Sequence, residues 1–225
     1  MKPRVPFKNL FCATPPFRVT QENAALLLVD IQRFATRRDE GLGEEAQRRG
    51  ILREFEEYYA QVDAALRNVQ RLLAVCREHS LPVIHTLLNC SSAGGRDLSR
   101  QLEVSGLPIP TGAPEDEIRP EVAPLPSEPV LPRGTYSPFA GTGLLSVLRE
   151  KGVDTLVLAG MLANTTVALT AQEAADRDLG VIMVWDASAS ESLYWHEIIK
   201  TGLVGPLIRT RTVQQVFEMM EGTRT

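Results

Sequence analysis

Short runs of apolar and β-branched residues recur along the chain, separated by longer stretches with a helical rhythm. The runs lie at 25–29, 83–88, 155–159 and 181–185, and Leu207-Ile208 begins another. Each run is apolar at consecutive rather than alternate positions, which is typical of parallel strands that are buried on both faces. Between residues 55 and 76, apolar residues return every three or four positions, which predicts a long helix with one buried side.

Further helices are expected at 144–149, 190–200 and 213–220. Strands that alternate with helices predict the α/β class, here a three-layer sandwich with a mostly parallel six-stranded sheet and helices on both faces. The 225 residues, 44% of them hydrophobic, suffice for one well-buried core. We therefore expect a single domain over residues 1–225, in which residues 1–20 form an N-terminal extension.

Two stretches are expected to be irregular. Residues 37–50 are charged and contain glycine, and residues 106–132 contain eight prolines with acidic residues between them. Long, Pro-rich connections often carry function, so we interpret 106–132 as a lid or a subunit interface.

Composition narrows the class of partner and the compartment. The net charge of −4 argues against nucleic acid as the main partner. Three cysteines at wide spacing favour a reducing compartment and no structural zinc. The first 16 residues lack a continuous apolar run, which argues against a signal peptide and against a membrane span there, so we expect a cytoplasmic protein. Because Gly-rich phosphate loops and acidic metal clusters are absent from the sequence, we expect no metal and no cofactor.

Polar residues follow several of the predicted strands. In open parallel sheets, ligands bind beyond the carboxyl ends of the strands, where Asp30, the pair Asn89 and Cys90, Thr166 and Asp186 are expected to converge. The segment 156–171 reads as a buried strand, a Gly turn and a helix start. Backbone N–H groups and the positive end of the helix dipole at such a junction can hold an anion or a developing oxyanion.

Three segments carry a resemblance to a known family. They are Leu26-Leu-Leu-Val-Asp30-Ile-Gln32-Arg-Phe34, Tyr136-Ser-Pro-Phe139-Ala-Gly-Thr142-Gly-Leu144, and the run from Gly160 through Ala163-Asn164 and Thr166-Val167 to Thr170-Ala171. Together they resemble the isochorismatase-like (cysteine hydrolase) superfamily over about residues 20 to 215. The resemblance implies a Rossmann-like α/β fold and hydrolysis of a small molecule.

The resemblance also implies roles at a catalytic site. Asp30 matches the general acid/base, Thr166 stands where the family has its nucleophilic cysteine, and Arg133 lies where a lysine is expected. The backbone N–H groups of Leu162 and Thr166 would polarise the substrate, with a cis peptide bond between Met161 and Leu162. Isochorismatases of this superfamily cleave a vinyl ether without the cysteine, with the aspartate as proton donor, which a Cys-less site can follow.

Other residues of these segments are candidates for binding. Phe34, Tyr136 and Phe139 either wall the pocket or belong to the core. Asn164 either orients the ligand or caps the helix start.

Two functions stay open. The first is a Cys-independent hydrolase of a small, anionic molecule, with Asp30 as general acid/base and Arg133 as anion anchor. The second is a catalytically inactive family member, a pseudoenzyme, that binds a small molecule or a partner chain, since both the nucleophilic cysteine and the lysine of the resembled family are missing. The resemblance further implies a homodimer or homotetramer, to which the apolar stretch 203–220 could contribute.

Overall fold

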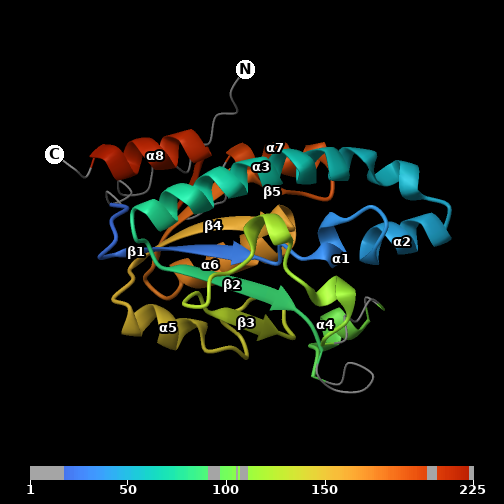
Figure 1. The fold of residues 1–225 in the computed structure, drawn as a ribbon, viewed down its shortest axis with the longest axis horizontal. Coiled ribbons are helices and arrows are strands. Elements are labelled where there is room, and N and C mark those ends of the chain that lie inside the picture. The colour runs from blue at the N-terminus through green and yellow to red at the C-terminus, as the bar shows by residue number, and fades with distance from the viewer. Residues whose placement is uncertain (1–17, 91–96, 105, 107–110, 202–206, 223–225) are drawn as a thin grey trace.

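The computed structural model describes residues 18–90, 97–104, 106, 111–201 and 207–222. Within these residues six strands form one sheet, in the spatial order β3-β2-β1-β4-β5-β6, and every neighbouring pair is parallel (Figure 1). The α/β prediction is confirmed, with an all-parallel sheet. The strands are β1 (Ala24–Val29), β2 (Val83–Leu88), β3 (Val130–Arg133), β4 (Thr155–Met161), β5 (Gly180–Ala189) and β6 (Ile208–Arg211).

Helices connect the strands and cover both faces of the sheet. The long helix predicted from the three-to-four rhythm is α3, and the others fall close to their expected ranges. The helices are α1 (Arg33–Thr36), α2 (Gly41–Arg48), α3 (Glu56–Glu78), α4 (Arg100–Glu103), α5 (Leu144–Glu150), α6 (Ala168–Ala175), α7 (Leu193–Thr201) and α8 (Val213–Glu221). Short 3₁₀ turns lie at Leu52–Phe55 (η2), Pro114–Asp116 (η3) and Pro120–Val122 (η4), and a π-helical turn at Ala163–Val167 (η5).

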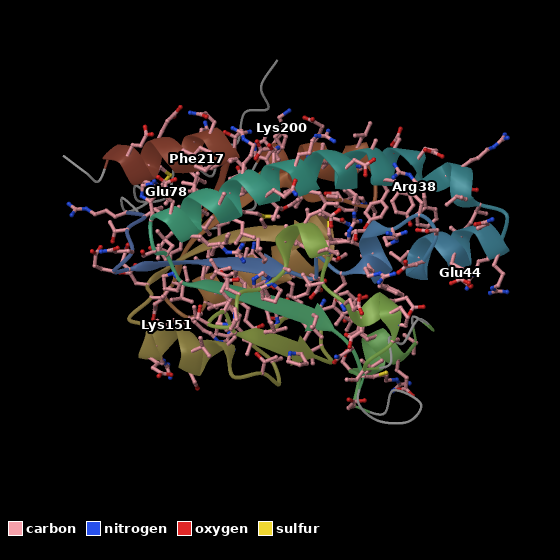
Figure 2. The ribbon with its side chains drawn as sticks, in the orientation of Figure 1. Arg38, Glu44, Glu78, Lys151, Lys200 and Phe217 are labelled. Atoms are coloured by element: carbon pink, nitrogen blue, oxygen red, sulfur yellow. The ribbon has the colours of Figure 1, made fainter. Side chains whose placement is uncertain are left out.

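The sheet separates two hydrophobic cores. Leu26 and Leu28 of β1 point into the core beneath α3 and α8, whereas Leu27 and Val29 point into the core beneath α5, α6 and α7. Both sets are fully buried, which confirms that β1 is covered on both faces. Phe217 of α8 packs against α3, with the Arg71 guanidinium 5.9 Å from its ring centroid, while charged side chains such as Lys151 stand on the outer surface (Figure 2).

Both stretches that we expected to be irregular contain regular structure. Residues 41–48 form α2, in which Glu45 accepts hydrogen bonds from Arg48 and Arg49 at helical spacing, so the charges stabilise a helix rather than a loop. Residues 130–133 form β3, which the sequence prediction missed because Pro132 breaks the strand pattern. As an edge strand, β3 tolerates a proline.

The described part of the Pro-rich segment is tied to the chain that follows β1. Ile118 forms an antiparallel bridge with Gln32, and the Arg119 N–H donates to the Ile31 carbonyl. Residues 107–110 of this segment lie outside the described residues, as do residues 1–17 of the proposed N-terminal extension and residues 203–206 of the apolar C-terminal stretch. No helix in the described part of the chain is long and apolar enough to cross a membrane.

Glu128 holds three elements together ahead of β3. Its carboxylate accepts hydrogen bonds from the Arg77 guanidinium of α3 at 2.8 Å and from the Leu125 N–H, and its Oε2 lies 3.0 Å from His85 Nε2 in β2. Burial raises the pKa of this carboxyl, but the bonds from Arg77, Leu125 and His85 together outweigh burial and lower the pKa to about 2. Glu128 therefore contributes stability only while it is ionised.

The pH dependence of stability should report this contact. A carboxyl with a pKa depressed in the folded state contributes fully above its unfolded pKa of about 4.5, and that contribution is lost as the pH falls from about 4.5 towards 2. We expect Glu128→Gln to lower the free energy of unfolding at pH 7 by roughly 2–3 kcal/mol and to flatten the acid limb of the profile. Urea denaturation between pH 2.5 and 7 measures both, and an unchanged acid limb would contradict the assignment.

The second prediction concerns the close approach of β1 and β4. A Cβ at Gly160, whose φ is +138°, would lie 2.0 Å from the Val29 carbonyl oxygen. Gly160→Ala should therefore destabilise the fold by more than about 3 kcal/mol, because a backbone clash adds to a φ that alanine avoids. Gly143 provides the control, because its φ is −81° and a methyl group added there would meet no atom within 4 Å. Gly143→Ala should change the free energy of unfolding by less than about 1 kcal/mol.

Candidate functional site

The carboxyl end of the sheet brings Asp30 beside Thr86 and Arg133. Asp30 follows β1 directly, with a positive φ of 50°, and its N–H donates to the Thr86 carbonyl in β2. Arg133 is the last residue of β3 and stands opposite Leu88 of β2. Because β1, β2 and β3 are parallel neighbours, their ends meet at one edge, where residues 30, 86 and 133 lie together.

Arg133 and Asp30 form a bidentate ion pair, in which two guanidinium nitrogens, the two prongs of the fork, each bind one carboxylate oxygen. Arg133 Nε donates to Asp30 Oδ1 at 3.0 Å, and a terminal guanidinium nitrogen, Nη2, donates to Asp30 Oδ2. The Thr86 hydroxyl donates to Asp30 Oδ1 at 2.9 Å, and Arg133 Nη1 donates to the Thr135 carbonyl. Both carboxylate oxygens are therefore occupied by donors from the protein.

The ion pair is almost completely buried. Asp30 is 6% exposed and Arg133 is 3% exposed, so each charge depends on the other for stabilisation. Burial lowers the pKa of the Arg133 guanidinium, and the Asp30 carboxylate in contact with it favours the charged form. The forked geometry is specific to guanidinium and carboxylate, since an ammonium offers one charge centre rather than a planar fork.

Thr166 lies in the turn that follows β4. Gly160 of β4 stands opposite Val29, so the turn begins beside the end of β1. The Met161–Leu162 peptide bond is cis, as the family resemblance implied, and the Leu162 carbonyl accepts from the Thr165 and Val167 N–H groups.

A π-helical turn, η5, replaces the ordinary helix start that we expected, and such turns are frequent at functional sites. Thr166 is buried within η5, and its carbonyl accepts from the Thr170 hydroxyl at 2.6 Å. In the described part of the chain, the Thr166 hydroxyl has no hydrogen-bond partner.

Asn164 fastens this turn to the loop after β5. Its Oδ1 accepts from the Glu191 N–H at 3.2 Å, and no side-chain cap is formed at the start of η5 or α6 in the described chain. Beside it, Ser190 Oγ lies 3.4 Å from His196 Nδ1. Asn164 thus positions η5 against β5 rather than capping its own helix.

The three aromatic candidates lie in different surroundings. Phe34 is half-buried and packs against the core beneath α3, while Phe139 is buried in the opposite core with the Arg177 guanidinium 5.0 Å from its ring centroid. Tyr136 is half-buried and close enough to Arg133 to raise its pKa, against the larger effect of burial. Of the three, Tyr136 is therefore the one that acts on Arg133.

Spacing alone placed Asp186 at this edge, and we interpreted its role as structural. The strand predicted at 181–185 continues to Ala189 as β5, so Asp186 lies inside the strand. There its Oδ1 accepts from the Val213 N–H at the start of α8, at 2.9 Å, which is a structural role. At the end of β2, Asn89 donates to the Asp116 carboxylate, and the Cys90 carbonyl accepts from Thr111.

Two residues at this edge were absent from the predicted site. Thr86 contacts Asp30 directly, and the signal in the sequence was a polar residue inside an otherwise apolar strand. Gln32 links β1 to the end of β2, because its side chain accepts from the Leu88 N–H and donates to the Leu88 carbonyl. Among the described residues, no group of three or more His, Cys, Asp or Glu side chains is arranged to hold a metal ion.

Comparisons with known proteins agree with this architecture. The isochorismatase domain family matches residues 24–213. The isochorismatase of Bacillus subtilis (strain 168) is 31% identical over 131 residues, which are 58% of this chain and 42% of that protein. The secreted isochorismatase effector Isc1 of Verticillium dahliae is 26% identical over 174 residues, 77% of this chain and 76% of that protein. The match therefore spans less than half of the first relative.

A solved structure gives the same result for the fold. The crystal structure of a cysteine hydrolase from Pseudomonas syringae pv. phaseolicola 1448A superposes with a TM-score of 0.74 at 20% identity, over 92% of this chain and 96% of that one. At this identity the likeness concerns the fold.

The buried ion pair makes a prediction for stability. Arg133→Met leaves the Asp30 carboxylate buried without its counter-charge and should lower the free energy of unfolding by about 3–5 kcal/mol. The double variant Asp30→Asn/Arg133→Met removes both charges and should recover part of that loss. Arg48→Met, which breaks an exposed pair with Glu45, is the control and should cost less than about 1 kcal/mol. Equal losses for Arg133→Met and Arg48→Met would show that Arg133 is not the counter-charge of Asp30.

Proposed function

Since this chain belongs to the isochorismatase family of hydrolases, we propose that it hydrolyses a small, anionic molecule without a cysteine nucleophile. Asp30 is the general acid/base of this reaction, and Arg133 is the anchor for the anionic group of the substrate. The observation that carries the proposal is the contact between the buried Asp30 carboxylate and the Arg133 fork at the carboxyl end of the sheet.

Two replacements distinguish the proposed site from that of the cysteine hydrolases. Thr166 takes the place of the nucleophilic cysteine and Arg133 that of the lysine. Contact between Arg133 and Asp30 supports the second assignment, because a cation in the lysine position has to reach the aspartate. The placement of Thr166 in the turn after β4 supports the first.

A hydroxyl at position 166 is a poor nucleophile in these surroundings. It requires a base to remove its proton, and His is the usual one. In the described chain none of the three histidines hydrogen-bonds to Thr166: His85 contacts Glu128, His196 contacts Ser190, and His79 lies near α8 at the other end of the sheet. The proposed reaction therefore proceeds through proton transfer at Asp30 rather than through a covalent intermediate.

In this mechanism, binding of the anionic substrate releases Asp30 from one of its bonds to Arg133. Its carboxylate competes with Asp30 for the Arg133 fork, because both are planar acceptors of the same geometry. Once one prong of Arg133 turns to the substrate, an oxygen of Asp30 becomes available to exchange a proton with the substrate or with water. The N–H groups of Leu162 and Thr166 then polarise the reacting group.

One observation favours the second candidate function, that of a catalytically inactive binding protein. Donors of the protein occupy both oxygens of Asp30, and the ion pair is nearly excluded from solvent. A protein that binds without turnover needs no free carboxylate. The two candidates differ in one measurable respect, which is the formation of product.

Turnover decides between them. The protein is incubated with carboxylate-bearing amides, esters and vinyl ethers, and product is followed by mass spectrometry. We expect hydrolysis of at least one class by the unmodified protein and a loss of more than about 100-fold in Asp30→Asn, which cannot exchange the proton. Asp63→Asn, an acid of the exposed face of α3, is the control and should keep full activity.

Thr166→Ala separates the two kinds of mechanism. Without a covalent role, removal of the hydroxyl should reduce kcat by less than about tenfold, whereas loss of a true nucleophile costs about 10⁴-fold or more. Product formation by Asp30→Asn at the normal rate would refute the assignment of Asp30. Saturable binding across the panel with no product from the unmodified protein would establish the inactive binding protein instead.

A further inference from the structure

Exposed apolar side chains gather at the start of α7. Leu193, Tyr194 and Trp195 follow one another there, and Leu169 lies on the first turn of α6, which packs on β5 and β6 as α7 does. All four are between 43% and 70% exposed, and they are four of the six large hydrophobic side chains that are exposed in the described part of the chain. We call these four residues the α7 surface. Exposed apolar residues that gather in this way are typical of an interaction site.

The sequence of α7 explains why its own domain does not cover these side chains. A surface helix usually turns one apolar stripe towards the core and polar residues towards solvent. In α7 only Ile199 is fully buried, and it belongs to the core beneath α5, α6 and α7. The apolar residues of the first turn point elsewhere, so α7 is apolar on more than the side that faces the sheet. A helix of this kind is suited to being covered from both sides.

The first turn of α7 is held in place by hydrogen bonds within the protein. The Trp195 N–H donates to Ser192 Oγ at 3.4 Å, and the His196 N–H donates to the Ser192 carbonyl at 3.0 Å. The His196 ring in turn packs edge-on against Trp185 of β5, with the ring centroids 5.6 Å apart. A surface that is ordered beforehand avoids part of the entropic cost of association.

The charges on α7 are balanced within the helix. Glu197 and Lys200 form an ion pair at 3.2 Å, and Lys200 Nζ also lies 4.8 Å from the centroid of the Trp185 ring. An anionic membrane or a nucleic acid is attracted by unpaired basic side chains, and α7, all of which the structure describes, has none. A second copy of this chain brings the same neutral surface, so that neither attraction between opposite charges nor repulsion between like charges decides the contact.

The size of the α7 surface is close to what a dimer needs. A standard interface covers about 800 Å² on each partner, and a little over half of it is non-polar. At their exposed fractions the four side chains present on the order of 300–400 Å² of mostly apolar surface, which is most of that non-polar share. Closed two-fold homodimers are the commonest soluble assemblies, and their interface joins one patch to an identical patch.

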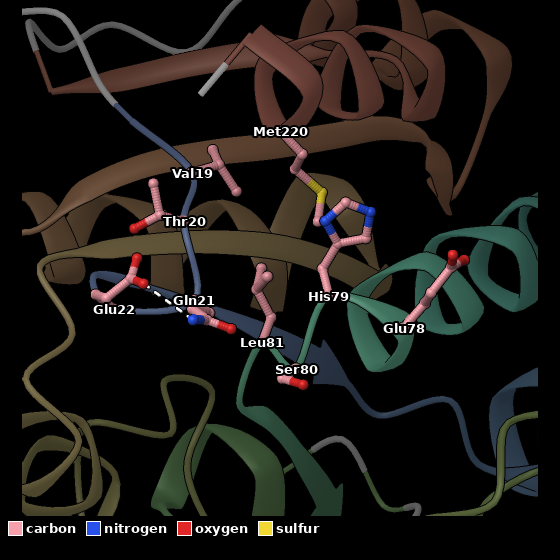
Figure 3. Close-up of a pocket in the computed structure, with 9 residues that line it drawn as sticks. All are labelled: Val19, Thr20, Gln21, Glu22, Glu78, His79, Ser80, Leu81 and Met220. Atoms are coloured by element: carbon pink, nitrogen blue, oxygen red, sulfur yellow. Dashed lines mark hydrogen bonds between the residues drawn. The ribbon is translucent and has the colours of Figure 1, made fainter. Parts of the chain in front are cut away.

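The apolar residues of α8 are, by contrast, already covered within the chain. Val213, Val216 and Met220 are buried in the core beneath α3, and Met220 reaches towards the ring of His79 at the end of that helix (Figure 3). These side chains offer almost no surface to a partner. The assembly contact that the sequence suggested for the stretch 203–220 is therefore better served by α7.

We propose that a second copy of this chain docks on the α7 surface and forms a two-fold homodimer. The interface adjoins the turn that carries Thr166, because α7 packs against η5 and the Glu191 N–H donates to Asn164 Oδ1 at 3.2 Å just before α7 begins. The second copy holds η5 from outside, which a monomer cannot do. The proposal does not rest on the hydrolase assignment, because it uses neither residue of the Asp30 ion pair.

The oligomeric state of the full chain is the first test. Sedimentation velocity between about 1 and 100 µM should show a reversible dimer with a dissociation constant in the micromolar range or below. The chain has two tryptophans, so Trp185→Phe leaves Trp195 as the only one. Its emission should shift to shorter wavelength over the concentration range in which the dimer forms, because the indole leaves water there.

Matched variants test the position of the interface. Leu193→Glu should raise the dissociation constant more than tenfold, roughly the effect of a charge placed against an apolar patch. Leu125→Glu is the control, because Leu125 is similarly exposed but precedes β3, at the opposite edge of the sheet from β6. Circular dichroism verifies that both variants are folded, and Tyr194→Ser, at the most exposed of the four positions, repeats the test with a smaller change.

Hydrogen exchange reports the effect on η5. The amides of residues 163–167 should exchange faster in Leu193→Glu than in Leu125→Glu, because only the first variant loses the second copy. Equal exchange in the two variants, with the first one monomeric, would show that the second copy does not support η5.

Cross-linking identifies what covers α7. In a mixture of ¹⁴N- and ¹⁵N-labelled full chain, zero-length coupling of carboxylates to lysines should join Lys200 of one copy to Glu197 of the other. Links between copies that spare α7 would overturn the proposal. So would links from Lys2 or Lys8 to Glu197 within one copy, because they would identify residues 1–17 as the occupant of the surface.

Two results in solution would also overturn the proposal. One is a full chain that stays monomeric up to about 100 µM. The other is equal weakening of the dimer by Leu193→Glu and Leu125→Glu, which would place the interface away from α7.

Discussion

The buried carboxylate of Asp30, at the end of β1, determines which residues must lie around it at the carboxyl edge of the sheet. An isolated charge in such a place is unfavourable by several kcal/mol, so Asp30 requires a cation and further donors within reach. Arg133 at the end of β3 and Thr86 in β2 supply them, and they can do so only because β1, β2 and β3 run parallel and end together. The edge strand β3 is therefore part of the site and not merely an extension of the sheet.

Much of this arrangement could be predicted from the sequence, and the reasons for the remainder are physical. Consecutive apolar residues revealed β1, β2, β4 and β5, because strands buried on both faces have no polar side. β3 was missed because it is short, lies at an edge and contains Pro132, so it lacks the pattern of an inner strand. α2 was missed because its charged residues pair with one another on a largely exposed surface, which resembles a loop in composition.

Prediction of the site from the sequence had different limits from prediction of the fold. Asp30, Arg133 and Thr166 could be proposed from motifs, since each stands at a fixed distance from recognisable neighbours. The bidentate ion pair between Arg133 and Asp30 could not be predicted in the same way, nor could the third bond, from Thr86. Both depend on the register of strands that are far apart in the sequence. Asp186 shows the converse: four further residues in β5 moved a strand-end carboxylate to the middle of a strand, where it binds the start of α8.

In the proposed site, the residues at positions 133 and 166 depend on each other through Asp30. A carboxylate that is held by both prongs of a guanidinium and by a hydroxyl is a weak base, because protonation would disrupt all three bonds. If residue 166 carried a thiol, the same fork would oppose its deprotonation by Asp30, and the thiol would lose the activation on which a cysteine nucleophile depends. A lysine, with one flexible charge centre, leaves an oxygen of the aspartate free and imposes no such restriction. In the proposed site, an arginine at position 133 thus removes the advantage of a cysteine at position 166, and the two proposed replacements amount to one change in the chemistry of the site. This is why we propose proton exchange at Asp30, made possible when an anion draws the guanidinium away, as the reaction of this site.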